Sequence, residues 1–193
     1  MKTDYTGNSI KITVKKKTMR QMLAIERALT SESRAALLRL PKPDKVCGRP
    51  VPRNLNDLTI GDLLDLQTGS DAHALIECIA SVILKVHPRR CYRERADRML
   101  GVVFWAGREL ERIARLFASV ANEPTPDEIK AGINDLDFGA FGILDWYAHR
   151  QGYQDQNDAA KVAWVRVREC LRIDNKRAAF ERRLREIIAN KNQ

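Results

Sequence analysis

Pairs of carboxylates are the first residues to test for chemistry, because general acid–base catalysis and binding of hard cations both need acidic groups close together. Asp62 and Asp65 stand three residues apart, and Asp135 and Asp137 flank a leucine. Neither pair has a histidine, a lysine or a third carboxylate at an interval that would complete a site. Helix capping and exposure to solvent explain both pairs, so we predict neither a metal site nor a catalytic site here.

The cysteines and histidines are equally scattered. A structural zinc site needs closely spaced ligand pairs, but the four cysteines form no Cys-x-x-Cys pair and the three histidines lie far apart. Cys78 and Cys170 fall inside apolar helical patterns, which predicts buried, reduced thiols. Cys91 has basic neighbours that would lower the pKa of its thiol. No base or orienting group stands beside it in the sequence, so we predict no nucleophile.

No known catalytic motif stands out. The chain has no Gly-x-Ser-x-Gly elbow, no phosphate-binding Gly-Lys-Ser/Thr loop and no dinucleotide fingerprint. Asp137-Phe138-Gly139 spells a kinase tripeptide, but the other kinase motifs are missing. We therefore predict that the protein is not an enzyme and binds no cofactor and no metal.

Composition narrows the class of protein. The 193 residues are 44% hydrophobic and 31% charged, which is typical of a soluble globular chain with a real core. No apolar run approaches the roughly 18 to 20 residues that a membrane span needs. The first residues are polar and lack the apolar core of a secretion signal. We expect a cytoplasmic protein without a membrane partner.

The positive charge is unevenly distributed. The net charge is +9, and residues 1–57 hold 13 basic and 5 acidic residues, a net +8. Such a basic region fits a surface for an acidic partner, nucleic acid included. Helical ion pairing is an alternative explanation for the C-terminal arginines. The candidate nucleic-acid contacts are Lys15, Lys16, Lys17, Arg20, Arg177, Arg182, Arg183 and Arg185.

Apolar periodicity predicts the elements that would position these residues. Residues 92–120 carry apolar side chains at steps of three and four, which predicts a long central core helix. Residues 9–14 alternate between polar and β-branched apolar types, which predicts a short strand. This strand has no convincing partner apart from a weak extended possibility near Val46 or Val51. Its apolar residues, Ile10, Ile12 and Val14, are therefore candidates for pairing with another copy or a partner's sheet edge.

The fold class that follows is mainly α: a multi-helix bundle around the long central helix, with a short N-terminal β-strand on a basic arm. Five prolines and glycines between residues 41 and 52 predict a loop. We take this loop as a linker, which divides the chain into a basic arm of residues 1–54 and a helical body of residues 55–193. The aromatic-rich segment 138–147 either lines a pocket or packs as core, and core is the favoured interpretation.

Local signals predict where the helices begin and end. The expected helix N-caps are Thr18, Thr59, Ser70, Thr125 and Asp174, and Asp71 is expected in the first turn after Ser70. A further helix is expected to begin at residue 157 or 158. Pro88 ends a helix at or before His87, and Gly152 ends the aromatic one. The last helix carries a narrow apolar stripe among many charges: Phe180, Leu184, Ile187 and Ile188.

One phrase suggests a family. Leu58-Thr59-Ile60-Gly61-Asp62-Leu63 follows a predicted strand and basic helix and precedes a helical body. In this the chain resembles the tail assembly chaperones of tailed bacteriophages and related small helical phage proteins, in which such a phrase often opens a helix. The likeness covers the order of elements over residues 10–120 and actual residues only over 58–66. It implies a non-enzymatic protein that holds tail or tape-measure subunits during virion assembly in the host cytoplasm.

Two functions from different classes follow. The first is a non-catalytic assembly, scaffolding or chaperone protein that acts through helical surfaces on a phage structural subunit or on a second copy of itself. The second is a nucleic-acid-binding protein that uses the basic arm and the arginine-rich last helix. Binding that falls steeply with salt distinguishes the second from the first.

Overall fold

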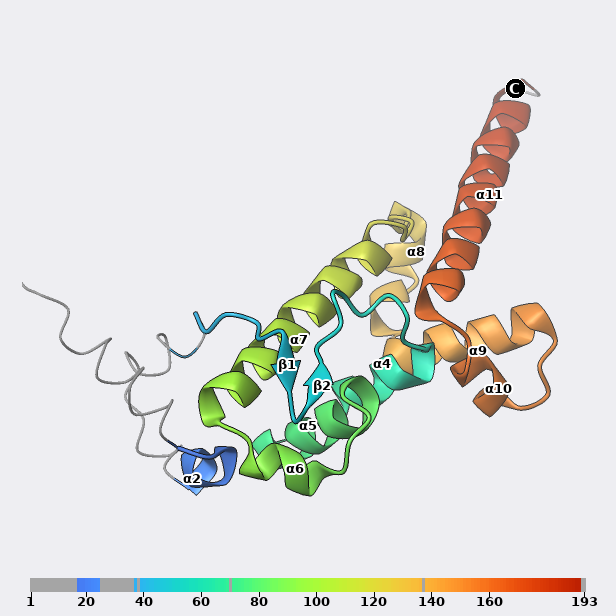
Figure 1. The fold of residues 1–193 in the computed structure, drawn as a ribbon. Coiled ribbons are helices and arrows are strands. Elements are labelled where there is room, and N and C mark those ends of the chain that lie inside the picture. Colours follow the sequence, from blue (N-terminus) through green and yellow to red (C-terminus); the bar gives the residue numbers. More distant parts are fainter. Residues whose placement is uncertain (1–16, 25–36, 38, 70, 137, 192–193) are drawn as a thin grey trace, which may run out of the picture. The chain divides into compact units, whose positions relative to one another are not determined.

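The structure is a computed structural model, and it describes residues 17–24, 37, 39–69, 71–136 and 138–191. The protein is mainly helical, as predicted (Figure 1). The predicted strand with Ile10, Ile12 and Val14 lies outside the described residues, and so do Lys15 and Lys16. The strand pairing therefore stays a prediction.

The elements follow one another as α2 (Met19–Ala24), β1 (Lys45–Val46), β2 (Arg49–Pro50), α4 (Ile60–Gln67), α5 (Ala72–Cys78), the π-helix η2 (Ile79–Ile83), α6 (Pro88–Arg93), α7 (Ala96–Ala118), α8 (Pro126–Lys130), the 3₁₀-helix η3 (Ile133–Asp135), α9 (Gly139–Gln151), α10 (Gln156–Ala160) and α11 (Trp164–Lys191). They form two compact units. Unit 1 comprises residues 1–55 and 65–110, and unit 2 comprises residues 56–64 and 111–193. The predicted boundary between residues 54 and 55 stays a prediction.

Unit 1 is built on the first part of α7. Met99 and Val102 are fully buried there, which confirms the apolar face predicted for this helix. Residues of the predicted linker pack along it, because the Lys42 ammonium lies 5.1 Å from the centre of the Trp105 ring. The same loop approaches Gly101 so closely that a Cβ there would lie 2.5 Å from the carbonyl oxygen of Pro41. Glycine thus allows the chain to lie directly on the helix.

The predicted central helix starts later than the apolar pattern indicates. We predicted residues 92–120, but α6 ends at Arg93 and α7 begins at Ala96. The backbone between them pairs with the segment before α2: Met19 N–H donates to the Glu94 carbonyl, and Ala96 N–H donates to the Lys17 carbonyl. These bridge hydrogen bonds need an extended backbone, so the helix is interrupted there.

A tight hairpin joins β1 and β2. Lys45 pairs with Pro50 and Val46 with Arg49, which leaves Cys47 and Gly48 as a two-residue turn. Both turn residues have positive φ, 53° and 75°, as a type I′ turn requires. Asparagine or glycine normally occupies such positions, and a cysteine there costs conformational energy. The weak extended signal at Val46 is thus a real strand, paired with β2.

A wide turn continues α5. We expected a single α-helix that ends at or before His87, but Leu84 N–H donates to the carbonyl of Ile79, five residues earlier. All the hydrophobic residues of this turn are buried: Ile79, Ala80, Val82, Ile83 and Leu84. One stripe of an α-helix cannot hold five nearly consecutive buried residues. The π-turn spreads them over more of the circumference.

Unit 2 is centred on Trp164, which is 2% exposed. Its ring lies 6.0 Å from that of Phe117 at 42°. Thr59 forms an isolated bridge with Ala163, and Ile60 N–H donates to the carbonyl of Val162. The chain before α4 and the start of α11 are thereby joined. Val167, Leu144 and Tyr147 complete this core: all three are buried.

Side chains of α11 close the end of α7. The Arg168 guanidinium donates from Nε to the carbonyl of Leu116, at 2.8 Å. Asn175 Nδ2 donates to the carbonyl of Val120 at 2.8 Å, and Asn122 Nδ2 donates to the carbonyl of Asn175. The last carbonyls of a helix have no intrahelical partner, and a cation is favoured beside them. α11 thus supplies the C-terminal cap of α7 from a distant part of the chain.

The predicted caps are mostly correct. Thr18, Thr59 and Thr125 each accept from the third residue onward, and each threonine N–H donates back to that residue's side chain. Gly152 ends α9 in the left-handed conformation, as predicted. The α5 prediction was shifted by one residue, because Asp71, rather than Ser70, is the N-cap and accepts from Ala74 N–H.

The last two predicted helices were placed wrongly. α10 is confined to residues 156–160. α11 is a continuous helix of 28 residues, Trp164–Lys191, and residue 174 lies inside it. Asp174 is therefore not an N-cap. Its carboxylate accepts from the Arg150 guanidinium at 2.7 and 3.2 Å. An acidic residue can therefore lie inside a helix and bind a distant arginine instead of capping a helix start.

In the part of the chain that the structure describes, none of the helices combines the length and the apolar character that crossing a membrane requires.

Candidate functional site

The exposed apolar surface of unit 2 is the first candidate site. Single exposed apolar residues are ordinary on a protein surface, whereas groups of them mark interaction sites. Among the described residues, the large apolar side chains that are exposed all fall between residues 129 and 188: Ile129, Ile133, Leu136, Phe138, Phe141, Tyr153, Val165, Phe180, Leu184, Ile187 and Ile188. Described residues of unit 1 contribute none of them.

One part of this surface is a stripe along the last turns of α11, and we call it the α11 stripe. Phe180, Leu184, Ile187 and Ile188 are separated by four, three and one residues, so they share one helix face. The predicted stripe is real, and its four side chains are between 43% and 59% exposed. A helix face this apolar normally packs on another element.

A second part lies around the start of α9. A shallow depression of about 330 Å³ is lined by Leu136, Phe138, Gly139, Gly142, Ile143, Trp146 and Leu171. We had predicted the aromatic segment to be core. This is correct for Leu144 and Tyr147, but wrong for Phe138 and Phe141, which are 69% and 58% exposed. The helical pattern identifies the apolar residues but not how many sides of the helix are covered.

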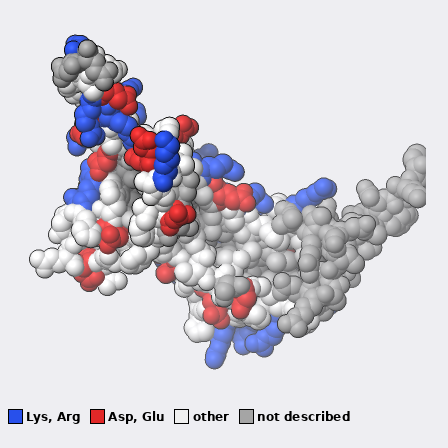
Figure 2. All heavy atoms as spheres, turned by 180° about the vertical axis from the view of Figure 1, so that it is seen from behind, with Lys and Arg blue, Asp and Glu red and all other residues white. Residues whose placement is uncertain are grey.

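Two of the four α11 arginines predicted to contact nucleic acid are engaged within the chain. Arg182 pairs with Glu128 at 3.7 Å, and Arg185 Nε donates to the carbonyl of Glu181. The described residues supply no such contact for Arg177 or Arg183. Figure 2 shows Lys and Arg interspersed with Asp and Glu along α11. Lys17 and Arg20, the described part of the other basic cluster, belong to unit 1.

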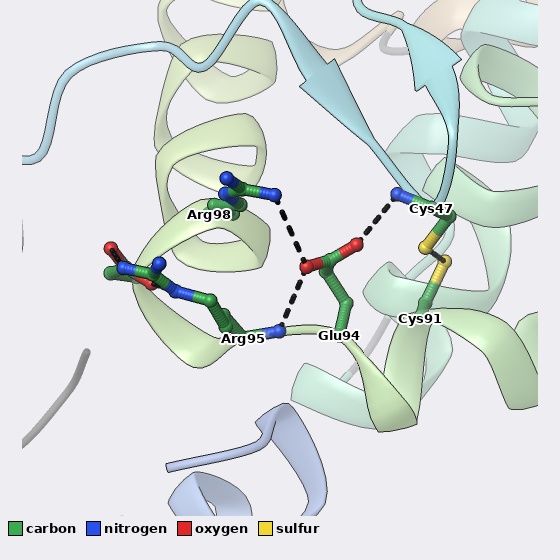
Figure 3. Close-up of polar contacts among 6 residues, drawn as sticks. Cys47, Cys91, Glu94, Arg95 and Arg98 are labelled. Carbon is green, nitrogen blue, oxygen red and sulfur yellow. Dashed lines mark hydrogen bonds and ion pairs between the residues drawn. The ribbon is translucent and has the colours of Figure 1, made fainter. Parts of the chain in front are cut away.

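A second candidate site is a pair of cysteines in unit 1 (Figure 3). The turn of the β1–β2 hairpin places Cys47 against Cys91 of α6, with the two Sγ atoms 3.7 Å apart. Both residues are buried, and both are free thiols. The sequence interpretation missed this pair, since 44 residues separate the two positions. The available signal was the Cys-Gly dipeptide between two short extended segments, which predicts a hairpin turn.

Glu94 holds the hairpin turn in place. Its Oε2 accepts from Cys47 N–H at 2.8 Å, while Oε1 accepts from Arg95 N–H at 3.0 Å and lies 3.9 Å from Arg98 (Figure 3). The Arg90 guanidinium lies beside the turn, since its Nη2 would be 3.5 Å from a Cβ on Gly48. The two thiols thus lie between a carboxylate and a guanidinium.

The two thiols have different acidities. A hydrogen bond with Cys91 lowers the pKa of Cys47, and the charge of Arg90 acts in the same direction against burial and Glu94. The same hydrogen bond, with burial next, raises the pKa of Cys91 well above the ordinary thiol value. Cys47 is therefore the thiol that ionises first, and Cys91 remains the proton donor beside it. The expectation that basic neighbours lower the pKa of Cys91 is wrong, because its hydrogen bond with Cys47 and its burial outweigh the charge of Arg90.

The remaining chemistry-bearing residues serve the fold. The Asp62 carboxylate accepts from Thr59 N–H in the capping box of α4, and the His87 side chain accepts from Arg89 N–H at the start of α6. His149 lies within 3.0 Å of the Asp145 carbonyl on the surface. Within the described ranges, no three His, Cys, Asp or Glu side chains gather in a way that could hold a metal ion. Cys78 and Cys170, predicted as buried, are half-buried.

Comparisons of the chain with protein-family models, with curated proteins and with solved structures found no match.

Proposed function

We propose that this protein is a non-catalytic assembly or chaperone protein of the phage-tail type, which binds apolar helical segments of a structural subunit through the exposed apolar surface of unit 2. The observation that supports this most is the concentration of exposed apolar side chains between residues 129 and 188. A partner helix that covers the α11 stripe would remove four large side chains from water. Burial of apolar area is the main driving force of such association.

The charges around the α11 stripe favour a protein over a nucleic acid as the occupant. Glu181 and Glu186 alternate with Arg182, Arg183 and Arg185 on the same helical turns. A partner helix with both charge signs complements such a rim, whereas a phosphate backbone would be repelled by the carboxylates. The second candidate is nucleic-acid binding through these arginines together with Lys15, Lys16, Lys17 and Arg20. Its affinity should fall steeply with salt, whereas apolar binding at the α11 stripe should not.

The test uses two matched double variants of α11. Leu184→Gln with Ile188→Gln removes half of the α11 stripe, and Arg177→Gln with Arg183→Gln removes two charges. All four residues lie in the same helix, and glutamine is a good helix former. Each variant is co-expressed with the tail structural subunits encoded in the same genome, and the fraction of subunit kept soluble and bound is measured.

We expect the apolar double variant to retain at least five-fold less soluble subunit than the wild type, and the arginine variant to retain as much as the wild type. Far-UV circular dichroism checks that both remain folded. A retained fraction that is equal for the two variants contradicts the proposal. The same proteins are then weighed in solution at low and high salt with a short DNA duplex. A shift onto the duplex at low salt that only the arginine variant loses would favour the nucleic-acid function instead.

The predicted strand contributes a separate test. Removal of residues 1–17 deletes Ile10, Ile12 and Val14 but leaves the α11 stripe intact. If this truncation reduces self-association or subunit binding, strand pairing is part of the mechanism. If it changes neither, strand pairing is excluded and the helical surface alone remains.

A further inference from the structure

Cys47 and Cys91 are placed to react with each other. Their Sγ atoms are 3.7 Å apart, and a disulfide bond is about 2.0 Å long. Closing the remaining gap of about 1.7 Å needs only small movements of two side chains and the turn. Cys78 and Cys170 have no thiol partner among the described residues. Among the described cysteines, Cys47 and Cys91 are thus the pair whose geometry allows a disulfide bond.

Cys47 stands on a short element of structure. It occupies the turn of a hairpin whose strands have only two residues each. The strands hold few backbone hydrogen bonds, but Val46 and Cys47 are buried, so glutathione reaches Cys47 when the hairpin opens locally. Cys91, in contrast, lies on α6 and is fully buried. The pair therefore combines a thiol on a short hairpin turn with a thiol on a helix.

We propose that Cys47 and Cys91 form a reversible intramolecular disulfide, a redox modification site that fastens the β1–β2 hairpin to α6. The oxidant belongs to the class of low-molecular-weight disulfides, of which oxidised glutathione is the example used below. This inference is independent of the function proposed for unit 2, because both cysteines belong to unit 1.

The reaction proceeds by two exchanges. The Cys47 thiolate attacks one sulfur of oxidised glutathione, which breaks that S–S bond, forms a mixed disulfide at Cys47 and releases one glutathione thiolate. Cys91 then loses its proton to solvent and attacks the Cys47 sulfur, which forms the intramolecular bond and releases the second glutathione. Two protein thiols are oxidised and one oxidised glutathione is reduced to two molecules of glutathione.

The surroundings assign the order of attack. Cys47 ionises more readily, since the hydrogen bond with Cys91 and the Arg90 guanidinium lower the pKa of its thiol. Cys91 reacts second, because its hydrogen bond with Cys47 and its burial raise its own pKa. The second step is intramolecular, so the effective concentration of Cys91 at the Cys47 sulfur is high. A small ionised fraction of Cys91 therefore suffices.

The experiment uses the full-length reduced protein in buffers of defined glutathione ratio. Intact mass should fall by two hydrogen atoms with no glutathione retained, and alkylation should then modify two cysteines, Cys78 and Cys170. The midpoint of thermal unfolding should rise by several degrees, because the bond restricts the unfolded chain. Dithiothreitol should reverse both changes.

Three variants identify the cysteines. Cys78→Ser with Cys170→Ser should leave the change in mass intact. Cys91→Ser should trap a mixed disulfide on Cys47, and Cys47→Ser should give no adduct on Cys91. If the reduced mass and melting midpoint stay unchanged in fully oxidised glutathione, or if oxidation only joins two chains through Cys78 or Cys170, the proposal is wrong. The Cys91→Ser result remains decisive even if Cys47→Ser fails to fold.

Discussion

Gly101→Ala is the substitution that tests most directly how the loop at Pro41 lies on α7. In an open helix interior this change stabilises a protein by about 1 kcal/mol, because alanine is the better helix former. At position 101 the new Cβ would lie 2.5 Å from the carbonyl oxygen of Pro41 and 3.1 Å from Cδ of Pro43. The first distance is shorter than any ordinary contact, so the loop has to move.

The size of the effect follows from these two opposing terms. Overpacking of a single methyl group costs about 1–3 kcal/mol when backbone must shift. Subtracting the gain of about 1 kcal/mol in helix propensity leaves a net loss of up to about 2 kcal/mol of unfolding free energy. Since both prolines precede the β1–β2 hairpin, the displacement should also loosen the turn that holds Cys47.

Gly107→Ala is the matched control. Gly107 lies on the same helix in the same unit, and a Cβ there would meet nothing within 4 Å. We expect this variant to be more stable than the wild type by about 0.5–1 kcal/mol. The two variants should thus shift the urea unfolding midpoint, followed by far-UV circular dichroism, in opposite directions. If Gly101→Ala is as stable as Gly107→Ala, the loop does not lie on the helix at this point.

Three further predictions concern unit 2. Trp164→Ala should cost about 3–5 kcal/mol, measured by urea unfolding, because the indole is 2% exposed and packs on Phe117. Arg168→Met should lower the unfolding free energy by about 1–2 kcal/mol, because the Leu116 carbonyl loses a charged donor while the apolar part of the side chain is kept. The backbone and hydroxyl of Thr125 lower the pKa of Glu128, so the stabilisation by this carboxylate is present above its unfolded pKa and lost as the pH falls through the folded one. In Thr125→Ala the carboxyl midpoint, followed by NMR, should move upward, and an unchanged midpoint would contradict this capping box.

The local signals predicted what local physics determines. A threonine three residues before an acidic or amide side chain gave correct helix starts at Thr18, Thr59 and Thr125, since both partners of a capping box lie within one turn. The apolar repeat of residues 92–120 predicted the buried face of α7 for the same reason. These features need no knowledge of the rest of the chain.

Several of the errors involve a contact from far away in the sequence. The break before Ala96 exists because the backbone there binds the segment around Thr18, and Asp174 fails as a cap because Arg150 binds it. The cysteine pair joins positions that no spacing rule connects. Likewise, the pattern around Phe138 cannot indicate whether another element covers it. Sequence periodicity shows that a face is apolar, whereas burial depends on the tertiary arrangement.

The π-turn of η2 has a consequence for the variation that this part of the chain can accept. Ser81 is its exposed residue, and the hydroxyl donates to the carbonyls of Glu77 and Cys78 at 2.9 and 3.1 Å. A π-turn holds one residue more than the α-turn it replaces. Deletion of Ser81 would close the turn to α-helical spacing, and one stripe of an α-helix could not hold the five buried residues of this stretch. Relatives of this protein should therefore exchange one apolar residue for another along this stretch. The number of residues in the stretch should stay constant.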